Sequence, residues 1–167
     1  MDLDATNRAI LHLLQRESRS RLTHDEVAEQ VGVSSSTVSN RLQDLKERGI
    51  LQEYRPVIDY ERAGVPHHLL FICTAAIADR GPICEQTIEI SGVVNVRELL
   101  AGTRNLHVEA IAMESGEIER IAEELDALGL EIEGSEILRN EYARPFDGFG
   151  REELEGESDS DPDSEQP

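Results

Sequence analysis

Polar and apolar residues between positions 23 and 49 recur at helical spacing and predict two short helices joined by a tight turn. Thr23 and Glu26 have the spacing of a capping box, so the first helix should begin directly after Thr23. Gly32 is able to adopt a positive φ and reverse the chain, and Ser34 is a strong N-cap for the second helix. This pattern is typical of a helix-turn-helix.

The second predicted helix has two unlike faces. Val38, Leu42 and Leu45 recur at i, i+4 and i+7, which should bury one side. Gly49 follows as a C′ residue that ends the helix. The opposite side should carry hydrogen-bonding side chains: Ser36, Asn40 and Gln43, flanked by Thr37, Ser39 and Arg41. Side chains of these types read base edges in the major groove of DNA.

A plain helical hairpin with a solvated polar face is the alternative interpretation. Serine and asparagine are mediocre helix formers. Four of them occupy the first two turns of the second helix: Ser35, Ser36, Ser39 and Asn40. Because that choice is poor for an ordinary surface helix, the pattern favours DNA binding.

The flanking residues extend this domain to positions 1–60. Asp4 is suited to cap an earlier helix. One face of that helix is marked by Leu3, Asn7, Ile10, Leu11 and Leu14. Residues 50–60 have strand character, and Arg55 with Pro56 predicts the tip of a short hairpin, the wing of a winged helix-turn-helix. A wing would set Arg55 against a DNA phosphate, and a solvated turn is the alternative for this arginine.

After a linker at residues 61–67, the pattern changes to that of a second domain over residues 68–146. The expected elements are a buried strand over 69–78, a short helix from 81, strands over 93–100 and 106–113, an amphipathic helix over 117–128 and a strand over 130–142. The order βαββαβ is that of a ferredoxin-like sandwich, so the fold class is α+β. Because two helices cover one face of such a sheet and the other face needs a partner, a homodimer is expected.

Charge is distributed unevenly along the chain. The formal net charge is −19, whereas nucleic-acid-binding proteins usually present a basic patch. Residues 1–64 hold 9 basic and 11 acidic side chains, a net of −2, and residues 65–167 hold 7 and 24, a net of −17. The N-terminal region is therefore nearly neutral, which weakens the objection to DNA binding there.

Lysine is almost absent, because Lys46 stands alone against fifteen arginines. An acid-rich, lysine-poor composition suits a cytoplasm with molar salt, and an acidic protein of ordinary salt is the alternative. At molar salt, counterion release drives DNA binding only weakly. Specificity would then depend on direct base contacts and on paired half-sites.

The remaining features bound the function further. Residues 147–167 carry nine acids and almost no apolar side chain, which predicts a disordered acidic tail for solubility, or alternatively a shield against nonspecific nucleic acid. Cys73 and Cys84 have no CxxC spacing and are interpreted as reduced core residues. Without a membrane-spanning run or a leader, the protein is expected to be cytoplasmic, with no membrane partner.

The chain resembles the Lrp/AsnC family, the leucine-responsive or feast/famine regulators, over roughly residues 1–143. The most specific matches are Leu3-Asp4, Ile10-Leu11, Ser34 to Arg41 with Leu42 and Leu45, and Gly49-Ile50. The resemblance implies a transcriptional regulator that binds double-stranded DNA, without enzymatic activity or cofactor. It implies a dimer through the second domain and, in many members, a higher assembly such as an octamer. The acidic composition marks it as a halophile-type member.

The resemblance also implies an amino-acid effector or related small metabolite. In the family, the loop between the second and third strands of the regulatory domain lies at a subunit interface and contacts the effector. That loop is residues 101–105 here, which assigns effector binding to Gly102, Thr103, Arg104 and Asn105, with Ser135 as a weaker member. Members that bind amino acids often carry an aromatic and an aspartate after the glycine. This chain departs from that pattern, which leaves the identity of the effector open, and Arg104 would pair with a carboxylate.

DNA contacts are assigned to Ser34, Ser35, Ser36, Thr37, Ser39, Asn40, Arg41 and Arg55. Ser34 and the backbone at the helix start should hold a phosphate. Asn40 suits adenine, and Arg41 suits guanine or a phosphate. A two-fold dimer would present its recognition helices to half-sites about one helical turn apart. An effector would act through the difference in its affinity for two states of the assembly.

Three other functions fit parts of the sequence. A tetrapyrrole (siroheme-type) decarboxylase of the same architecture would use His107 with arginines such as Arg97, Arg104 and Arg139. A metal-sensing regulator would use His67, His68, Cys73, Cys84 or His107, whose spacing matches no tight ligand set. An architectural protein would coat DNA without an effector and give broad genomic coverage in place of discrete peaks.

Overall fold

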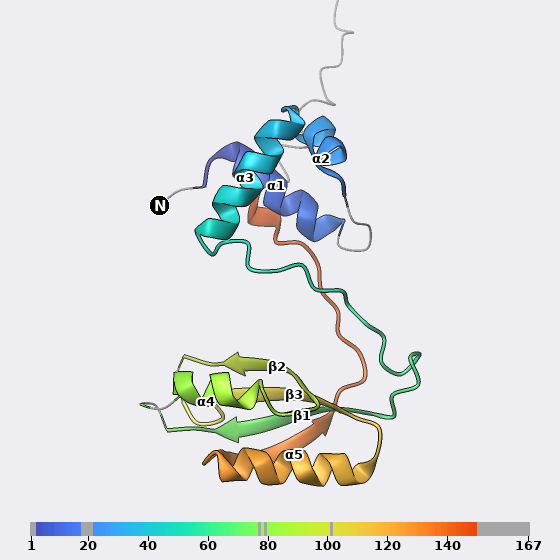
Figure 1. Ribbon diagram of the computed structural model, residues 1–167, viewed down its shortest axis with the longest axis vertical. Coiled ribbons are helices and arrows are strands. Elements are labelled where there is room, and N and C mark those ends of the chain that lie inside the picture. The colour runs from blue at the N-terminus through green and yellow to red at the C-terminus, as the bar shows by residue number, and fades with distance from the viewer. Residues whose placement is uncertain (1–2, 18–21, 77, 79, 101, 150–167) are drawn as a thin grey trace, which may run out of the picture. The chain divides into compact units, whose positions relative to one another are not determined.

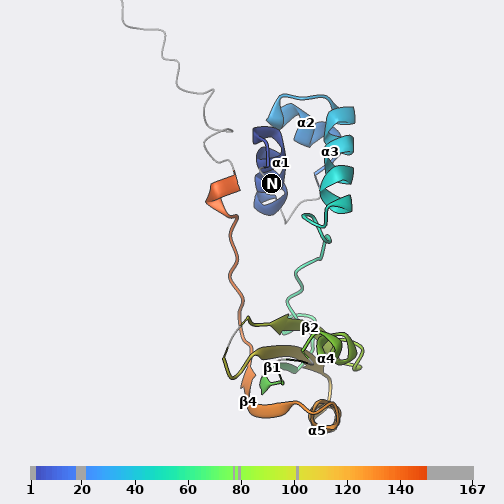
Figure 2. The same ribbon diagram turned by 90° about the vertical axis from the view of Figure 1, so that its left-hand side faces the viewer.

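The computed structural model describes residues 3–17, 22–76, 78, 80–100 and 102–149. The chain forms two compact units, each with its own core. One unit holds residues up to Pro56 together with the described residues from Tyr142 onward, and the other runs from Val57 to Glu141. Figures 1 and 2 show the elements of each unit.

Three helices make the first unit: α1 (Ala5–Arg16), α2 (His24–Val31) and α3 (Ser35–Glu47). The predicted caps of all three are confirmed. The Asp4 side chain accepts the backbone N–H of Asn7 at 2.8 Å. Thr23 and Glu26 form both halves of the capping box, and the Ser34 hydroxyl accepts the backbone N–H of Thr37 at 3.1 Å. Each cap satisfies an N–H group that the helix itself leaves without a partner.

The core of this unit lies where the three helices meet. The predicted face of α3 is confirmed, since Val38, Leu42 and Leu45 are all buried. In α1 the most deeply buried residues are Ile10 and Leu13, whereas the predicted Leu14 is only partly buried. The buried residues that pack together in one cluster are Ile10, Leu13, Val27, Ala28, Val38 and Leu42.

The hairpin predicted over residues 50–60 is wrong, because these residues contain no strand. Residues 51–59 run without regular structure and residues 60–64 form a turn. A strand needs a neighbour to take its backbone hydrogen bonds, and Arg55-Pro56 lacks the Gly or Asn that tight hairpin turns favour. Strand character in the sequence was therefore insufficient to form a wing.

A four-stranded antiparallel sheet and two helices make the second unit, and the predicted α+β fold class is confirmed. The elements are β1 (His67–Thr74), α4 (Arg80–Thr87), β2 (Val93–Glu98), β3 (Leu106–Ala112), α5 (Ser115–Ala127) and β4 (Glu131–Ile137). The strand order is β2-β3-β1-β4, with every neighbouring pair antiparallel. This is the ferredoxin-like order. Both helices pack on one face of the sheet (Figures 1 and 2).

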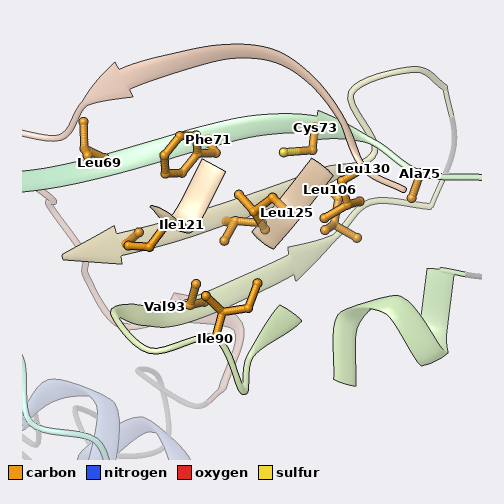
Figure 3. Close-up of a cluster of buried hydrophobic side chains, with 12 residues drawn as sticks. Leu69, Phe71, Cys73, Ala75, Ile90, Val93, Leu106, Ile121, Leu125 and Leu130 are labelled. Carbon is orange, nitrogen blue, oxygen red and sulfur yellow. The ribbon is translucent and has the colours of Figure 1, made fainter. Parts of the chain in front are cut away.

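The core between the sheet and its helices follows the alternation of the strands. In β1, Leu69, Phe71 and Cys73 are buried, and in β3 the buried partners include Leu106 and Val108. Figure 3 shows the side chains of β1 and Leu106 of β3 with Ile121 and Leu125 of α5. Successive side chains in a strand point to opposite faces. The residues between them, such as Leu70 and Ile72, therefore point to the helix-free face.

Gly92 is a tight point in this core. Its φ is +94°, and an added Cβ would lie 2.9 Å from both the Ile111 carbonyl oxygen and Ile121 Cδ1. Because backbone strain and overlap act together, Gly92→Ala should lower the free energy of unfolding of the sheet unit by about 1–3 kcal/mol, measured by chemical denaturation. Gly116→Ala is the matched control, since Gly116 lies in α5 with nothing within 4 Å of an added Cβ. Equal stability of the two variants would contradict this account.

The last described residues return to the first unit, which differs from the predicted boundary at residue 146. β4 ends at Ile137, earlier than expected, and Asp147–Phe149 form the short helix η2. The Phe146 backbone N–H donates to Gln15 Oε1 of α1 at 3.2 Å, and the Phe146 and Phe149 rings meet edge to face at 5.0 Å. Residues 147–149 are therefore ordered, while the rest of the predicted tail lies outside the described residues. Within the described part of the chain, the helices are too short or too polar to span a bilayer.

Candidate nucleic-acid interface

The outer face of α3 is polar and accessible. Ser36, Ser39, Asn40 and Gln43 are exposed, opposite the buried side of the helix. The Gln43 amide donates to Glu47 at 2.9 Å. Asn40 therefore lies at the middle of a face whose side chains have the donors and acceptors that base edges require.

Hydroxyl groups gather at the start of α3. Besides accepting the Thr37 N–H, the Ser34 hydroxyl lies 2.9 Å from Ser36 Oγ and 2.8 Å from Thr37 Oγ1. The Ser35 hydroxyl points elsewhere and donates to Asp25 Oδ1 in the first turn of α2. Ser35 thus ties the starts of the two helices together, a contact that sequence reasoning did not foresee. The N-terminal end of α3 carries the partial positive charge that favours a phosphate.

Arg41 is held by an acid from another helix. Its Nη1 lies 2.7 Å from Oδ2 of Asp4, whose other oxygen caps α1. Both side chains are partly exposed, 39% and 47%. Asp4 therefore orients Arg41 in the free protein, and any contact of Arg41 with DNA would require this ion pair to open. Sequence reasoning did not predict this pair because the two residues are far apart in the chain.

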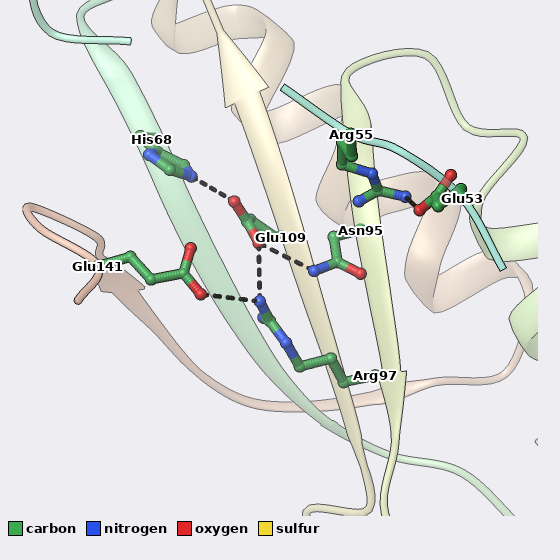
Figure 4. A network of polar contacts seen from close by, with 7 residues as sticks. All are labelled: Glu53, Arg55, His68, Asn95, Arg97, Glu109 and Glu141. Atoms are coloured by element: carbon green, nitrogen blue, oxygen red, sulfur yellow. Dashed lines mark hydrogen bonds and ion pairs between the residues drawn. The ribbon is translucent and has the colours of Figure 1, made fainter. Parts of the chain in front are cut away.

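Three other described cations of this region also have partners. Arg48 pairs with Asp44 at 3.0 Å, and the Lys46 ammonium lies 5.5 Å from the centre of the Tyr54 ring. Arg55 pairs with Glu53 at 2.7 Å, as Figure 4 shows. Since Arg55 lies in a segment without strands, the structure does not place it at the tip of a wing. These pairs reduce the excess positive charge on the described part of this unit, which lowers the share that overall charge could contribute to DNA binding.

The loop between β2 and β3 is fixed to the end of β1. Asn105 is 2% exposed, and its amide both accepts the Ala75 N–H and donates to the Ala75 carbonyl, each at 2.9 Å. The Arg104 N–H donates to Thr74 Oγ1 at 2.8 Å, and Arg104 has a positive φ of 58°. Asn105 therefore shapes the loop from within, while Gly102, Thr103 and Arg104 are exposed. Ala101 lies outside the described residues.

Ser135 is separated from this loop within one chain. It lies on the edge strand β4, opposite Phe71 of β1. The loop joins β2 and β3, on the other side of β1 in the sheet. The structure thus brings the exposed loop residues together and leaves Ser135 apart from them.

A cluster of polar side chains on the helix-free face of the sheet was not predicted (Figure 4). Glu109 Oε1 lies 2.7 Å from His68 Nε2, and Glu109 Oε2 accepts from Asn95 and from Arg97, each at 3.3 Å. Burial alone would raise the pKa of Glu109, but the hydrogen bonds from His68 and Asn95 and the charges of His68 and Arg97 outweigh it, so the pKa is lowered. Period-2 alternation of β3 would have placed Glu109 on this face, but its partners depend on strand register.

The described residues give little support to a metal-sensing site or a tetrapyrrole site. Among the described side chains, no three His, Cys, Asp or Glu residues are placed to hold a metal ion. Cys73 and Cys84 are free thiols, and burial raises the pKa of Cys73 to about 11. For a tetrapyrrole site, His107 has Arg97 as its register partner, but Arg104 lies in the loop and Arg139 follows β4.

Residues 3–52 match a protein family described as winged helix-turn-helix DNA-binding. The match covers all three helices and ends within the segment that follows α3. The exposed polar face of α3 lies within the matched residues.

Two relatives in Pyrococcus horikoshii are HTH-type transcriptional regulators. One is 34% identical over 64 residues, which cover 38% of this chain and 42% of the relative, so the chain spans less than half of that protein. The other is 26% identical over 152 residues, covering 87% of this chain and 94% of the relative.

Solved structures share the two-domain fold. The structure of MtbAldR superposes with a TM-score of 0.70 at 24% identity, covering 86% of this chain and 99% of that one. The leucine response regulatory protein LrpA of Mycobacterium tuberculosis gives 0.66 at 20%, covering 84% and 95%. A Neisseria meningitidis transcriptional regulator, solved as a complex with L-Met, gives 0.64 at 21%, covering 86% and 94%. The chain thus has the domain order and fold of Lrp-type regulators.

Proposed function

We propose that this protein is a transcriptional regulator of the Lrp/AsnC type that reads DNA with α3 and works as a homodimer. The observation that carries the proposal is the exposed polar face of α3 within a winged helix-turn-helix DNA-binding domain. The regulators in Pyrococcus that resemble the chain support the same role. Such a protein acts in the cytoplasm, by binding and without catalysis.

The proposed DNA contacts divide by chemistry. Asn40 reads adenine through its amide, which is able to make two parallel hydrogen bonds, and Ser36 and Ser39 contact neighbouring base edges. Arg41 leaves Asp4 to bind guanine or a phosphate. Ser34 and the N–H groups at the start of α3 face a phosphate. Contacts by Ser35, Thr37 and Arg55 to the DNA backbone complete the set of proposed residues.

The dimer sets the geometry of the operator. Two copies related by a two-fold axis present two recognition helices, so the half-sites should be inverted repeats with centres about 34 Å apart. The helix-free face of the sheet is the proposed contact between copies. Assembly to an octamer is a further step that the family resemblance suggests.

An effector is proposed at the loop of residues 102–105. The Neisseria structure with L-Met shows that a protein of this fold binds an amino acid. In this chain, exposed Arg104 is available for a carboxylate, and Asn105 holds the loop in shape. Because Ser135 lies apart from the loop within one chain, it would join the pocket only from another copy.

Selection of bound sequences from random DNA tests the proposed function. The full chain should enrich a two-fold symmetric site, and Asn40→Ala should relax base preference at one position in each half-site while leaving the other positions unchanged. The expected cost at that position is about 1–3 kcal/mol per half-site. Glu123→Ala, on the exposed side of α5, is the control and should select the native site. A uniform loss of affinity for all sequences in the Asn40 variant would contradict base reading.

A further inference from the structure

The helix-free face of the sheet combines aliphatic side chains with a nearly buried carboxylate. Leu70, Ile72 and Ile111 are partly buried on this face, although α4 and α5 both lie on the other face. At its centre the Glu109 side chain is only 9% exposed, beside His68 at 20% and Arg97 at 41%. A surface of this kind is a candidate for contact with another protein.

The net charge of the cluster around Glu109 depends on the protonation of His68. Glu109 and Glu141 are negative, and Arg97 lies between them, 3.3 Å from Glu109 and 3.7 Å from Glu141. With His68 neutral the cluster carries one net negative charge, and with His68 protonated it is neutral. The His68 ring also packs edge to face on Tyr60 at 5.0 Å. His68 therefore decides whether the cluster is charged.

The other ionisable groups on this face come from the remaining strands. His107 lies two residues before Glu109 in β3 and opposite Arg97 in β2. On β4, Glu136 faces across Leu70 toward Glu109, and Glu133 bonds to Thr74. His107 is thus a second histidine on this face, and it needs its own control.

These charges favour a second copy of the chain as the occupant. The β4 edge is acidic through Glu133 and Glu136, and the β2 side carries Arg97 and His107. A two-fold axis parallel to the strands places the β4 edge of each copy over the β2 side of the other, so that Glu133 and Glu136 lie toward Arg97 and His107 and not over a second row of carboxylates. A carboxylate at the centre of the face argues against a nucleic acid there.

We propose that this face is covered by a second copy of the chain and that covering it is coupled to the uptake of a proton by His68 in each copy. The proposal rests on the homodimer of the proposed function. Removing water from the cluster costs more when it carries a net charge than when it is neutral. The lowered pKa of Glu109 keeps this carboxylate ionised near neutral pH, so it is not the group that changes. Association is therefore stronger at low pH and weakens as pH rises through the histidine range.

Sedimentation of the full chain at fixed salt between pH 6 and pH 8 tests the proposal. The dimer dissociation constant should be at least about tenfold larger at pH 8, because up to two protons are taken up per dimer. His68→Gln keeps a donor for Glu109 and should abolish the pH dependence. His107→Gln should retain it. Glu109→Gln should weaken it, because His68 then loses the carboxylate that favours its protonated form.

Each outcome separates this proposal from the homodimer itself. A dimer whose dissociation constant is the same at pH 6 and pH 8, or whose pH dependence survives in His68→Gln, would overturn the proton coupling and leave the homodimer standing. Monomers at every pH would overturn both. Circular dichroism and thermal unfolding of each variant show that the fold is retained, so that a change in association is not confused with misfolding.

Discussion

Replacing Asn40 and Arg41 together by alanine is expected to lower affinity for the selected operator by at least about a hundredfold, because each base contact is worth roughly 1–3 kcal/mol and a dimer loses two on each recognition helix. The affinity of the variant for the operator should not fall below its affinity for nonspecific DNA. Both side chains project from the accessible part of α3, and Arg41 pairs with the partly exposed Asp4. Competition binding with operator and scrambled DNA measures the effect.

The matched control for this double variant is Glu123→Ala with Asp126→Ala, two exposed residues of α5. This control should bind the operator with native affinity. Affinity for scrambled DNA should change much less than affinity for the operator in the Asn40/Arg41 variant. An equal loss on operator and scrambled DNA would show that α3 contacts only the phosphate backbone.

Ile121→Ala should lower the free energy of unfolding of the sheet unit by about 2–5 kcal/mol, since removal of a fully buried aliphatic side chain leaves a cavity. Ile121 is 0% exposed at the centre of the core between α5 and the sheet. It also lies against the space that a Cβ on Gly92 would enter, so the surrounding backbone has little freedom to collapse. Denaturant unfolding of the full chain measures this loss through the unfolding transition of the sheet unit.

Ile88→Ala is the control for the same chemical change at a surface position. Ile88 follows α4 and is 41% exposed, so its substitution should change the free energy of unfolding by no more than about 0.5 kcal/mol. The difference between the two variants isolates burial from the identity of the side chain. If both variants lost the same stability, Ile121 would not be a core residue.

Local signals in the sequence predicted the helix-turn-helix. The capping box of Thr23 and Glu26, the Ser34 N-cap and the apolar spacing of Val38 and Leu42 each act within a few residues. Such features depend on residues within one helix, so distant parts of the chain do not change them. The order of strands and helices in the second unit was also predicted, because its apolar runs and one amphipathic helix are long enough to identify.

Features that need a distant partner were not predicted. The segment at Arg55-Pro56 has strand residues but no neighbouring strand to pair with. The segment around Phe146 follows β4 but packs on α1 through Gln15, which no local pattern indicates. The predicted boundary at residue 146 followed composition, and composition does not report tertiary contacts.

The candidate sites show the same division. Asn40 on its exposed face was predictable from helical periodicity alone. The pairing of Arg41 with Asp4, and of His68 with Glu109, depends on packing and strand register across the fold. Asn105 was predicted from a family loop, but its amide is used to hold the loop on Ala75. Chemistry that depends on two distant residues requires the structure.

Genome-wide crosslinked occupancy of the native protein, beside the Asn40→Ala/Arg41→Ala variant at the cell's own salt, tests the central claim most directly. A regulator that reads sequence through α3 should give discrete promoter peaks that disappear in the variant while its cellular level is unchanged. Those peaks would also name the genes from which the effector is to be sought. Diffuse coverage that persists in the variant would contradict sequence reading and indicate an architectural DNA-coating protein.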